Sequence, residues 1–270
     1  MSGTETVTNQ TVEDAEVRRE VTIAAIGDLH VDENTRGALT DAFANVSSKA
    51  DYLVLCGDMT THGRPEQMRA FVEELRGIEI PIIAVLGNHD YEGESVDELT
   101  AILRGRGVHV LEGDFVIIDG VGFAGVKGFA GGFGRGSLAP FGERIIKEFV
   151  QFAIDDALRL ENAMRSLDTE VRVALLHYAP IPETILGEPE VIWPFLGSSR
   201  LLLPIETYDA TVVFHGHAHH GSLEGITPKG IPVYNVSQPV LAANELPIFL
   251  WKANAPERRK RAPDPGMGQA

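Results

Sequence analysis

The chain has 270 residues, of which 44% are hydrophobic and 23% are charged. These fractions are typical of a globular protein and exclude a disordered or collagen-like chain, and the length allows one large domain or two small ones. Lysine and arginine contribute 23 positive charges against 39 negative charges, which gives a net charge of −16. Such an acidic chain repels nucleic acid and anionic membranes, so we expect neither as a partner.

Two features indicate the compartment. Cys56 is the only cysteine, so no internal disulfide can form, and this suits a reducing compartment. The sequence has no run of about 18 apolar residues that would span a bilayer, and the polar segment Met1–Glu20 lacks the apolar centre of a secretory signal. We therefore expect a cytoplasmic protein.

The two ends of the sequence differ in composition from its centre. Residues 1–20 are polar and acidic, which predicts a mobile arm, and residues 253–270 combine prolines with the basic cluster 258–261, which predicts a disordered tail. A solvated tail is the simpler interpretation of the basic cluster, and contact with an anionic partner is the alternative. No repeat or linker divides residues 21–252, so we expect a single domain there.

The first part of this domain alternates between strand-like and helix-like segments. Short apolar runs predict strands at Val21–Ile26, Tyr52–Cys56 and Ile80–Leu86. Helical spacing of apolar residues predicts helices at Arg36–Val46, from Pro65 onward, and at Val96–Leu103. This alternation predicts a parallel sheet that is covered on both faces.

The pattern changes after this point. Further strands are predicted at Val108–Leu111, Phe115–Asp119, Val121–Val126, Val171–Leu176 and Thr211–Phe214, and near Leu223 and Val233. A long helix is predicted over about Phe141–Leu167. The glycine-rich segment Gly120–Gly136 predicts tight turns in its first half and a mobile flap in its second half. It lacks the Gly-Lys-Ser/Thr ending of a nucleotide-binding loop.

Polar side chains follow five of the predicted strands. The segments concerned are Gly27-Asp28-Leu29-His30, Gly57-Asp58, Gly87-Asn88-His89-Asp90, His177 and His215-Gly216-His217-Ala218-His219-His220. Because ligands bind beyond the carboxyl ends of parallel strands, these side chains are expected to lie at one edge of the sheet. Each motif by itself is commonly an ordinary turn or loop, so the prediction depends on all five together.

Aspartate, asparagine and histidine supply oxygen and nitrogen ligands without a thiolate, which suits Mn, Fe, Zn or Ni. Two metal ions that act on one phosphate need a carboxylate that bridges them and further ligands for each ion. The strand ends supply enough candidates for such a pair: Asp28, His30, Asp58, Asn88, His177, His217 and His219.

The ordered series of these motifs resembles the calcineurin-like metallophosphoesterase superfamily over about residues 21–250. The resemblance implies an α/β fold arranged as a four-layer α/β/β/α sandwich, with two divalent or mixed-valence metal ions (Mn, Fe, Zn or Ni). It implies that one ion is bound by Asp28, His30 and His219, that the other is bound by Asn88, His177 and His217, and that Asp58 bridges the two.

The same resemblance implies a mechanism, in which a metal-bridging hydroxide attacks phosphorus in line. The substrate would be a small phosphodiester, with nucleotides as one candidate, because the motifs are similar to those of bacterial class III cyclic-nucleotide phosphodiesterases. His89 would protonate the leaving oxygen or stabilise its charge; its alternative role is that of a hydrogen-bonding spacer beside Asn88. Asp90 would orient His89 or cap the following helix, and both roles stay open.

Other functions share these motifs. A phosphomonoesterase or Ser/Thr protein phosphatase would use the same metal ligands. A non-catalytic scaffold on the same fold is a further alternative, although scaffolds tend to lose ligands and all seven candidates are present here. The sequence leaves open the identity of the metals, the natural substrate and the oligomeric state.

Overall fold

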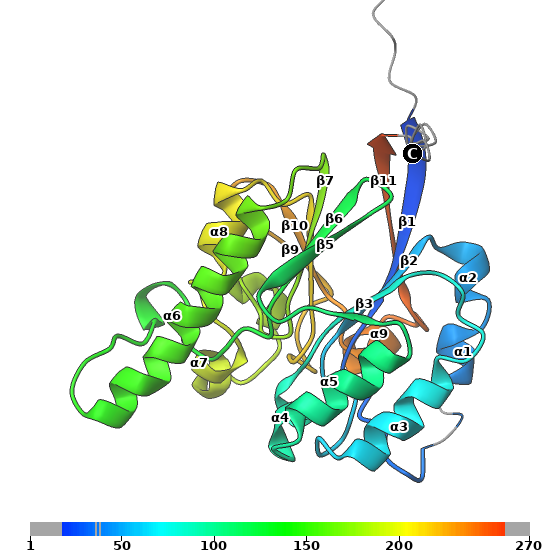
Figure 1. Ribbon diagram of the computed structural model, residues 1–270. Helices are drawn as coiled ribbons and strands as arrows, with labels where there is room; N and C mark the ends of the chain where they lie inside the picture. Colours follow the sequence, from blue (N-terminus) through cyan, green and yellow to red (C-terminus); the bar gives the residue numbers. More distant parts are fainter. Residues whose placement is uncertain (1–17, 36, 38, 257–270) are drawn as a thin grey trace, which may run out of the picture.

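The computed structural model describes residues 18–35, 37 and 39–256 (Figure 1). The strands are β1 (Arg18–Ile26), β2 (Tyr52–Cys56), β3 (Ile82–Val85), β4 (His109–Val110), β5 (Asp114–Ile118), β6 (Val121–Gly125), β7 (Val171–Leu175), β8 (Val212–His215), β9 (Glu224–Ile226), β10 (Pro232–Asn235) and β11 (Phe249–Pro256). The α-helices are α1 (Thr40–Phe43), α2 (Val46–Lys49), α3 (Pro65–Glu74), α4 (Asn88–Glu92), α5 (Val96–Gly105), α6 (Arg144–Arg165), α7 (Trp193–Leu196), α8 (Leu202–Thr207) and α9 (Gln238–Ala243). Short 3₁₀ helices are η1 (Gly134–Gly136), η2 (Pro182–Ile185) and η3 (Glu190–Ile192).

The strands form two mixed sheets. The first has the order β11-β1-β2-β3-β4, in which β1 to β4 are parallel and β11 is an antiparallel edge strand. The second has the order β5-β6-β7-β8-β10-β9, with parallel central strands and antiparallel strands at both edges. The α/β class predicted from the alternating segments is therefore confirmed.

The two sheets pack against each other through aromatic side chains. The ring of Tyr52 on β2 lies 5.2 Å from that of Phe123 on β6, and the ring of Phe214 on β8 lies 6.3 Å from that of Trp251 on β11. Helices α3 and α5 flank the first sheet, and α6 and α8 flank the second (Figure 1). Because the central strands are buried on both faces, their sequences are continuous apolar runs rather than alternating ones.

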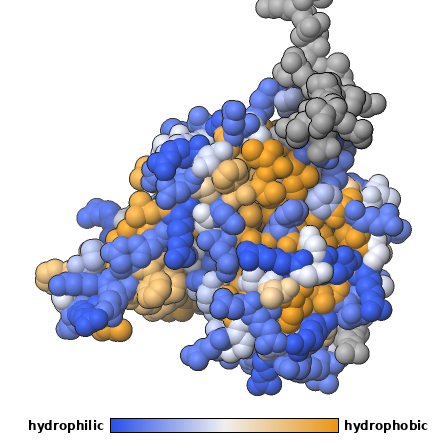
Figure 2. Space-filling model, viewed as in Figure 1, coloured by the Kyte–Doolittle hydropathy of each residue, from blue (hydrophilic) through white to orange (hydrophobic). Residues whose placement is uncertain are grey.

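The outer surfaces of the helices are more polar than the central strands. On the face shown in Figure 2, hydrophilic side chains cover much of the helices, and apolar side chains are visible between them. No helix among the described residues is both long enough and apolar enough to cross a bilayer.

The two ends of the described chain pair with each other. Strands β1 and β11 form an antiparallel ladder from Arg18 opposite Pro256 to Ala25 opposite Phe249. The predicted arm and tail are therefore too long, by three residues at one end and by four at the other, because these residues complete the ladder. Residues 1–17 and the basic cluster 258–261 lie outside the described part of the chain.

The single helix predicted at Arg36–Val46 is wrong. The segment instead holds the single-turn helices α1 and the start of α2, and Asn45 between them has a φ of 59°. A left-handed residue ends the run of helical hydrogen bonds, and asparagine adopts this conformation more readily than most residues. The apolar spacing was correct, since Phe43 and Val46 are buried, but it did not reveal the break.

The second half of the glycine-rich segment is bonded to another loop. The Gly131 amide donates to the Pro194 carbonyl at 2.8 Å, the Gly132 amide donates to the Gly197 carbonyl at 2.9 Å, and the Gly134 amide donates to Ser199 Oγ at 3.0 Å. The segment predicted as a free flap is thus paired with residues 194–199 in this structure.

Phe123 provides a test of the packing between the sheets. Its side chain is fully buried, so Phe123→Ala would leave a cavity and is expected to lower the free energy of unfolding by about 3–5 kcal/mol. Urea unfolding followed by circular dichroism measures this. Phe141, which is 82% exposed, is the matched control, and Phe141→Ala is expected to change the same quantity by less than about 0.5 kcal/mol. Equal effects of the two substitutions would contradict the packing described here.

Candidate metal centre

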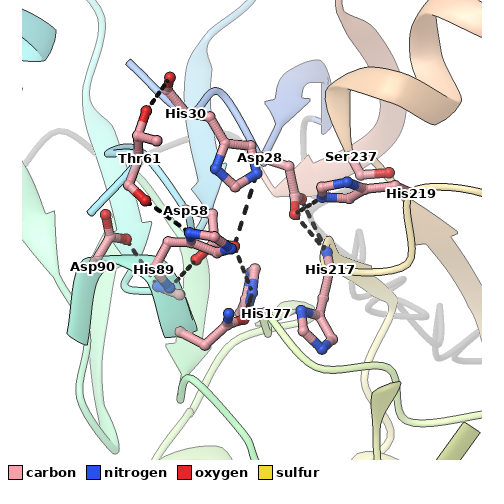
Figure 3. Close-up of polar contacts among 12 residues, drawn as sticks. Asp28, His30, Asp58, Thr61, His89, Asp90, His177, His217, His219 and Ser237 are labelled. Atoms are coloured by element: carbon pink, nitrogen blue, oxygen red, sulfur yellow. Dashed lines mark hydrogen bonds and ion pairs between the residues drawn. The ribbon is translucent and has the colours of Figure 1, made fainter. Parts of the chain in front are cut away.

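All seven predicted ligand residues lie at one edge of the fold, in the segments that follow β1, β2, β3, β7 and β8. Six of them lie in loops, and Asn88 is the first residue of α4. Backbone hydrogen bonds join these loops. The Asp28 amide donates to the Gly57 carbonyl at 2.9 Å, and the His30 amide donates to the Asp58 carbonyl at 3.0 Å. Figure 3 shows that the aspartate and histidine side chains of these loops point toward a common centre.

One group of potential ligand atoms comes from Asp28, His30 and His219, and these atoms lie within 4.8 Å of one another. His219 Nε2 lies 2.9 Å from Asp28 Oδ1, and this hydrogen bond raises the pKa of His219. The buried Asp28 carboxylate also accepts the His217 amide at 2.9 and 3.0 Å. The backbone after β8 therefore holds the carboxylate in place.

A second group comes from Asp58, His177 and His217, again within 4.8 Å. Asn88 joins it, because its Oδ1 lies 2.8 Å from His177 Nε2. His177 Nδ1 lies 2.9 Å from the Cys56 carbonyl, and since a carbonyl only accepts, Nδ1 carries the hydrogen and Nε2 faces the centre. Burial opposes protonation of His177, but the adjacent Asp58 carboxylate raises its pKa to about 9.

Asp58 connects the two groups. Its oxygen Oδ2 lies 4.0 Å from His30 Nε2 and 3.4 Å from His177 Nε2, while Oδ1 accepts the His89 amide at 2.8 Å. Burial opposes ionisation of Asp58, but His177 lowers the pKa of this carboxyl well below its usual range. A single ionised carboxylate thus lies between histidines of both groups, which is the position that a bridging ligand requires.

The donor atoms fit metal ions. His30 Nε2 is buried and has no hydrogen-bond partner within the described chain, and a buried polar atom without a partner costs about 1–3 kcal/mol. Coordination of a cation would remove this cost. Neutral imidazoles, carboxylates and an amide oxygen together are ligands that first-row divalent metals accept.

The backbone is strained at several of these residues. Asp28, His30, Asp58 and His217 have φ values of 57°, 45°, 51° and 69°. This left-handed conformation is uncommon for residues other than glycine, and such strain is concentrated at functional sites. The hydrogen bonds between the loops hold these residues in conformations that they would not adopt alone.

Two glycines allow the loops to approach the carboxylates. A Cβ atom at Gly87 would lie 2.1 Å from Asp58 Oδ1, and one at Gly216 would lie 2.1 Å from Asp28 Oδ2. These glycines directly precede Asn88 and His217. Their presence in the motifs is therefore explained by contact distance as well as by chain turning.

His89 lies at the open side of the centre. Its ring is 4.7 Å from that of His30 in an edge-to-face arrangement, and its Nδ1 lies 2.8 Å from the Thr61 carbonyl. Nδ1 therefore carries a hydrogen, which leaves Nε2 without a partner among the described residues. The side chain is 38% exposed, so a bound molecule has access to it.

Asp90 is fully buried and holds loops together. Its carboxylate accepts the Thr60 amide at 2.9 Å, the Thr60 hydroxyl at 2.8 Å and the Gly87 amide at 2.9 Å. These bonds cap the start of α4 and tie it to the loop after β2. Burial raises the pKa of Asp90 to about 6. These contacts cap α4, the helix to which Asp90 itself belongs, whereas the helix that follows in the sequence is α5. The two roles that the sequence left open for Asp90 stay predictions.

A cavity of about 340 Å³ opens beside Asn88. Its lining consists of Leu86, Asn88, Tyr91, Leu111, Glu112, Val126, Lys127, Phe129, Phe152, Asp155, Asp156, Arg159 and Tyr178. The motif analysis does not single out Lys127, although Lys127 follows the apolar run of β6 just as the ligand candidates follow their strands. The position of Lys127 after a strand was the feature of the sequence that could have identified it as a candidate binding residue.

Gly216 provides a test of the close packing at the centre. Gly216→Ala places a methyl group on the Asp28 carboxylate, and we expect a loss of about 1–3 kcal/mol in the free energy of unfolding. Gly105→Ala is the control, because a Cβ at this helical position meets nothing within 4 Å; it is expected to be neutral or stabilising by up to about 1 kcal/mol. Urea unfolding of both variants measures the difference, and equal stabilities would contradict the described contact.

One comparison with known proteins identifies a family. The family model for calcineurin-like phosphoesterases matches residues 21–221, while a search among curated proteins returned no match. The structure of phosphopantetheinyl hydrolase (PptH) from Mycobacterium tuberculosis is similar, with a TM-score of 0.62 and 17% identity, over 92% of this chain and 98% of that one.

Two further solved structures share the fold. The protein TT1561 of Thermus thermophilus has a TM-score of 0.56 and 17% identity, over 87% of this chain and 99% of that one. GAP50, described as the anchor in the inner membrane complex of Plasmodium, has a TM-score of 0.51 and 12% identity, over 82% of this chain and 72% of that one. At these identities, the likeness establishes a common fold and no more.

Proposed function

Because the chain belongs to the calcineurin-like phosphoesterase family, we propose that it is a metal-dependent hydrolase that cleaves a small phosphodiester, with nucleotides as one candidate substrate. The observation that carries this proposal is the position of Asp58. One oxygen of its buried carboxylate faces His30 on one side and His177 on the other. This arrangement supports a role for Asp58 as a ligand shared between two cations.

The ligands are assigned by their grouping and by the family resemblance, which leaves His89, a member of a third group with His30 and Asp58, as the proton donor. Asp28, His30 and His219 would hold one cation, and Asp58 would contact both. Support for this comes from the unpartnered His30 Nε2 in the first group. The second cation would be held by Asn88, His177 and His217. The mixed oxygen and nitrogen donors suit Mn, Fe, Zn or Ni.

Two divalent cations bound at these ligands would acidify a water molecule for attack on phosphorus and would neutralise charge on the phosphate. We propose that His89 donates a proton to the leaving oxygen or stabilises the negative charge on that oxygen. The Thr61 carbonyl fixes the orientation of the His89 ring by accepting a hydrogen bond from Nδ1, and Nε2 is left to face the substrate. Asp90 is assigned a positioning role, since it ties the loop that carries Asp58 to the start of α4, which carries His89.

Two alternatives remain distinct from this proposal. A phosphomonoesterase or Ser/Thr protein phosphatase would need the same ligands, so only substrate preference separates it from a diesterase. A non-catalytic role is the second alternative, because GAP50, which has a similar fold, is described as an anchor. The complete set of ligand candidates in this chain favours a hydrolase over a scaffold.

A cytoplasmic location belongs to the proposal as well. Cys56 is a free, buried cysteine, and burial raises the pKa of its thiol well above the usual value. Such a thiol is a stable core residue in a reducing compartment.

The proposal is tested by turnover of the manganese-loaded protein. We expect bis-p-nitrophenyl phosphate to be cleaved faster than p-nitrophenyl phosphate, measured by release of p-nitrophenolate. Asp58→Asn removes the shared carboxylate charge and is expected to lower kcat by at least about 100-fold, because metal ions contribute several kcal/mol to such reactions. Elemental analysis should show loss of bound metal in the same variant.

The exposed Asp41 of α1 supplies the control, and Asp41→Asn should leave both turnover and metal content unchanged. Cleavage of the monoester alone would replace the diesterase proposal by the monoesterase alternative. Full activity of Asp58→Asn would exclude the shared-ligand role.

His89 has a separate test. His89→Ala is expected to lower kcat for the preferred ester by about 10²–10⁴-fold, the usual contribution of proton transfer, without loss of bound metal. His62 is a nearby, exposed histidine that pairs with Glu92 at 3.2 Å, so His62→Ala serves as the matched control and should retain activity. A parallel loss of metal in His89→Ala would show that His89 is a ligand instead of a proton donor.

A further inference from the structure

The cavity beside Asn88, which we call the Lys127 pocket, adjoins the candidate metal centre. Asn88 belongs both to its lining and to the second ligand group. The backbone also connects the two sites, since the Lys127 carbonyl accepts the amides of His177 and Tyr178 at 3.0 Å each. A molecule with its phosphate at the metal centre would therefore extend directly into this pocket.

Lys127 is a partly buried cation inside the pocket. Its Nζ lies 4.9, 5.1 and 5.2 Å from the ring centres of Phe129, Tyr178 and Tyr91. It donates one hydrogen bond, to the Gly128 carbonyl at 2.9 Å, and no carboxylate of the described chain lies within 4.0 Å of it. An ammonium group has three donors, of which one hydrogen-bonds to the Gly128 carbonyl, and the aromatic faces stabilise its charge.

Two tyrosines, Tyr91 and Tyr178, also line the pocket. The hydroxyls of Tyr91 and Tyr178 have no hydrogen-bond partner among the residues that the structure describes. Burial raises the pKa of Tyr91 to about 12, so this hydroxyl keeps its hydrogen at neutral pH. The ammonium and the two hydroxyls together form a set of unused donors, which suits an acceptor with negative charge.

The acidic residues of the lining have partners. Burial raises the pKa of Asp156, and the charges of Lys127 and Arg159 oppose this rise. Asp156 lies 3.5 Å from Arg159, Asp155 accepts a hydrogen bond from Gln151 at 2.7 Å, and Glu112 lies 3.9 Å from Arg104. Their charges would repel a long polyanion. The rest of the lining is mainly apolar: Leu86, Leu111, Val126, Phe129 and Phe152. The pocket therefore favours a compact, largely apolar group that carries a single anionic substituent.

We propose that the Lys127 pocket binds the organic part of the phosphoester substrate, and that Lys127, with Tyr91 and Tyr178, binds a carboxylate or a second phosphoryl group on it. This inference rests on the proposed function, because it assigns the substrate class of that same site. Its volume of about 340 Å³ lies in the range of small-ligand pockets.

The test uses binding of non-hydrolysable ligands to the manganese-loaded protein, measured by calorimetry. The ligands are phenylphosphonate, 4-carboxyphenylphosphonate and 1,4-phenylenebisphosphonate. We expect one or both of the substituted ligands to bind at least about 10-fold more tightly than phenylphosphonate, the usual gain from a charged hydrogen bond. Which of them gains identifies the anionic group as a carboxylate or a phosphoryl group.

Lys127→Met is expected to abolish this 10-fold gain and to leave phenylphosphonate binding within about threefold of the original. Tyr91→Phe removes only a hydroxyl and is expected to reduce the gain by about threefold. This second variant tests the inference if Lys127→Met does not fold. The exposed Lys147 of α6 lies outside the pocket lining, so Lys147→Met is the matched control and should behave as the original protein.

Equal affinities for all three ligands, or equal losses for all three in Lys127→Met, would overturn the inference and leave Lys127 with a structural role. If the protein cleaves no ester but the substituted phosphonates still bind more tightly through Lys127, the proposed function alone is overturned. Turnover of esters together with Lys127-independent binding would overturn this inference alone.

Discussion

The structure around the candidate centre depends on one buried, ionised carboxylate, that of Asp58. A charge in this position is costly unless opposite charge and hydrogen bonds compensate it. The His89 amide supplies a hydrogen bond at 2.8 Å, and His177 supplies the facing imidazole. His89 follows β3 of the first sheet and His177 follows β7 of the second sheet. The contacts of this one carboxylate therefore link the two sheets.

The parallel arrangement of the central strands brings the partners of Asp58 together. Parallel strands place their carboxyl ends at one edge, so loops that are distant in sequence become neighbours. Asp28 and His217 are 189 residues apart and still share hydrogen bonds. Left-handed backbone at Asp28 and Asp58 costs free energy locally, and the packed sheets behind the loops supply the stability that offsets this cost.

The candidate metal centre and the Lys127 pocket have different chemical characters. The former is lined by carboxylates and imidazoles, which suit cations and the phosphate that cations attract. The latter combines aromatic rings with a lysine and suits an organic group. In the calcineurin-like phosphoesterases as a family, the fold by itself does not determine the substrate. In this chain, the residues that would distinguish substrates lie at Lys127 and the aromatic side chains around it.

The sequence by itself determined the α/β class and indicated where the chemistry lies. Both follow from local properties: buried parallel strands require continuous apolar runs, and loops that approach a carboxylate closely require glycine, as at Gly87 and Gly216. The positions of the seven candidate ligands at one edge could be predicted because each directly follows a strand.

Only the tertiary structure decided the features that depend on contacts between distant segments. Strand β11 forms because Phe249–Pro256 finds the free edge of β1, a partner about 230 residues away that no local pattern reveals. Asp90 ties α4 to the loop after β2 because the Thr60 amide, 30 residues away in the sequence, reaches its carboxylate in the folded chain. Lys127 is a candidate binding residue because three aromatic rings surround its ammonium group in the folded chain: Tyr91 of α4, Phe129 after β6 and Tyr178 after β7.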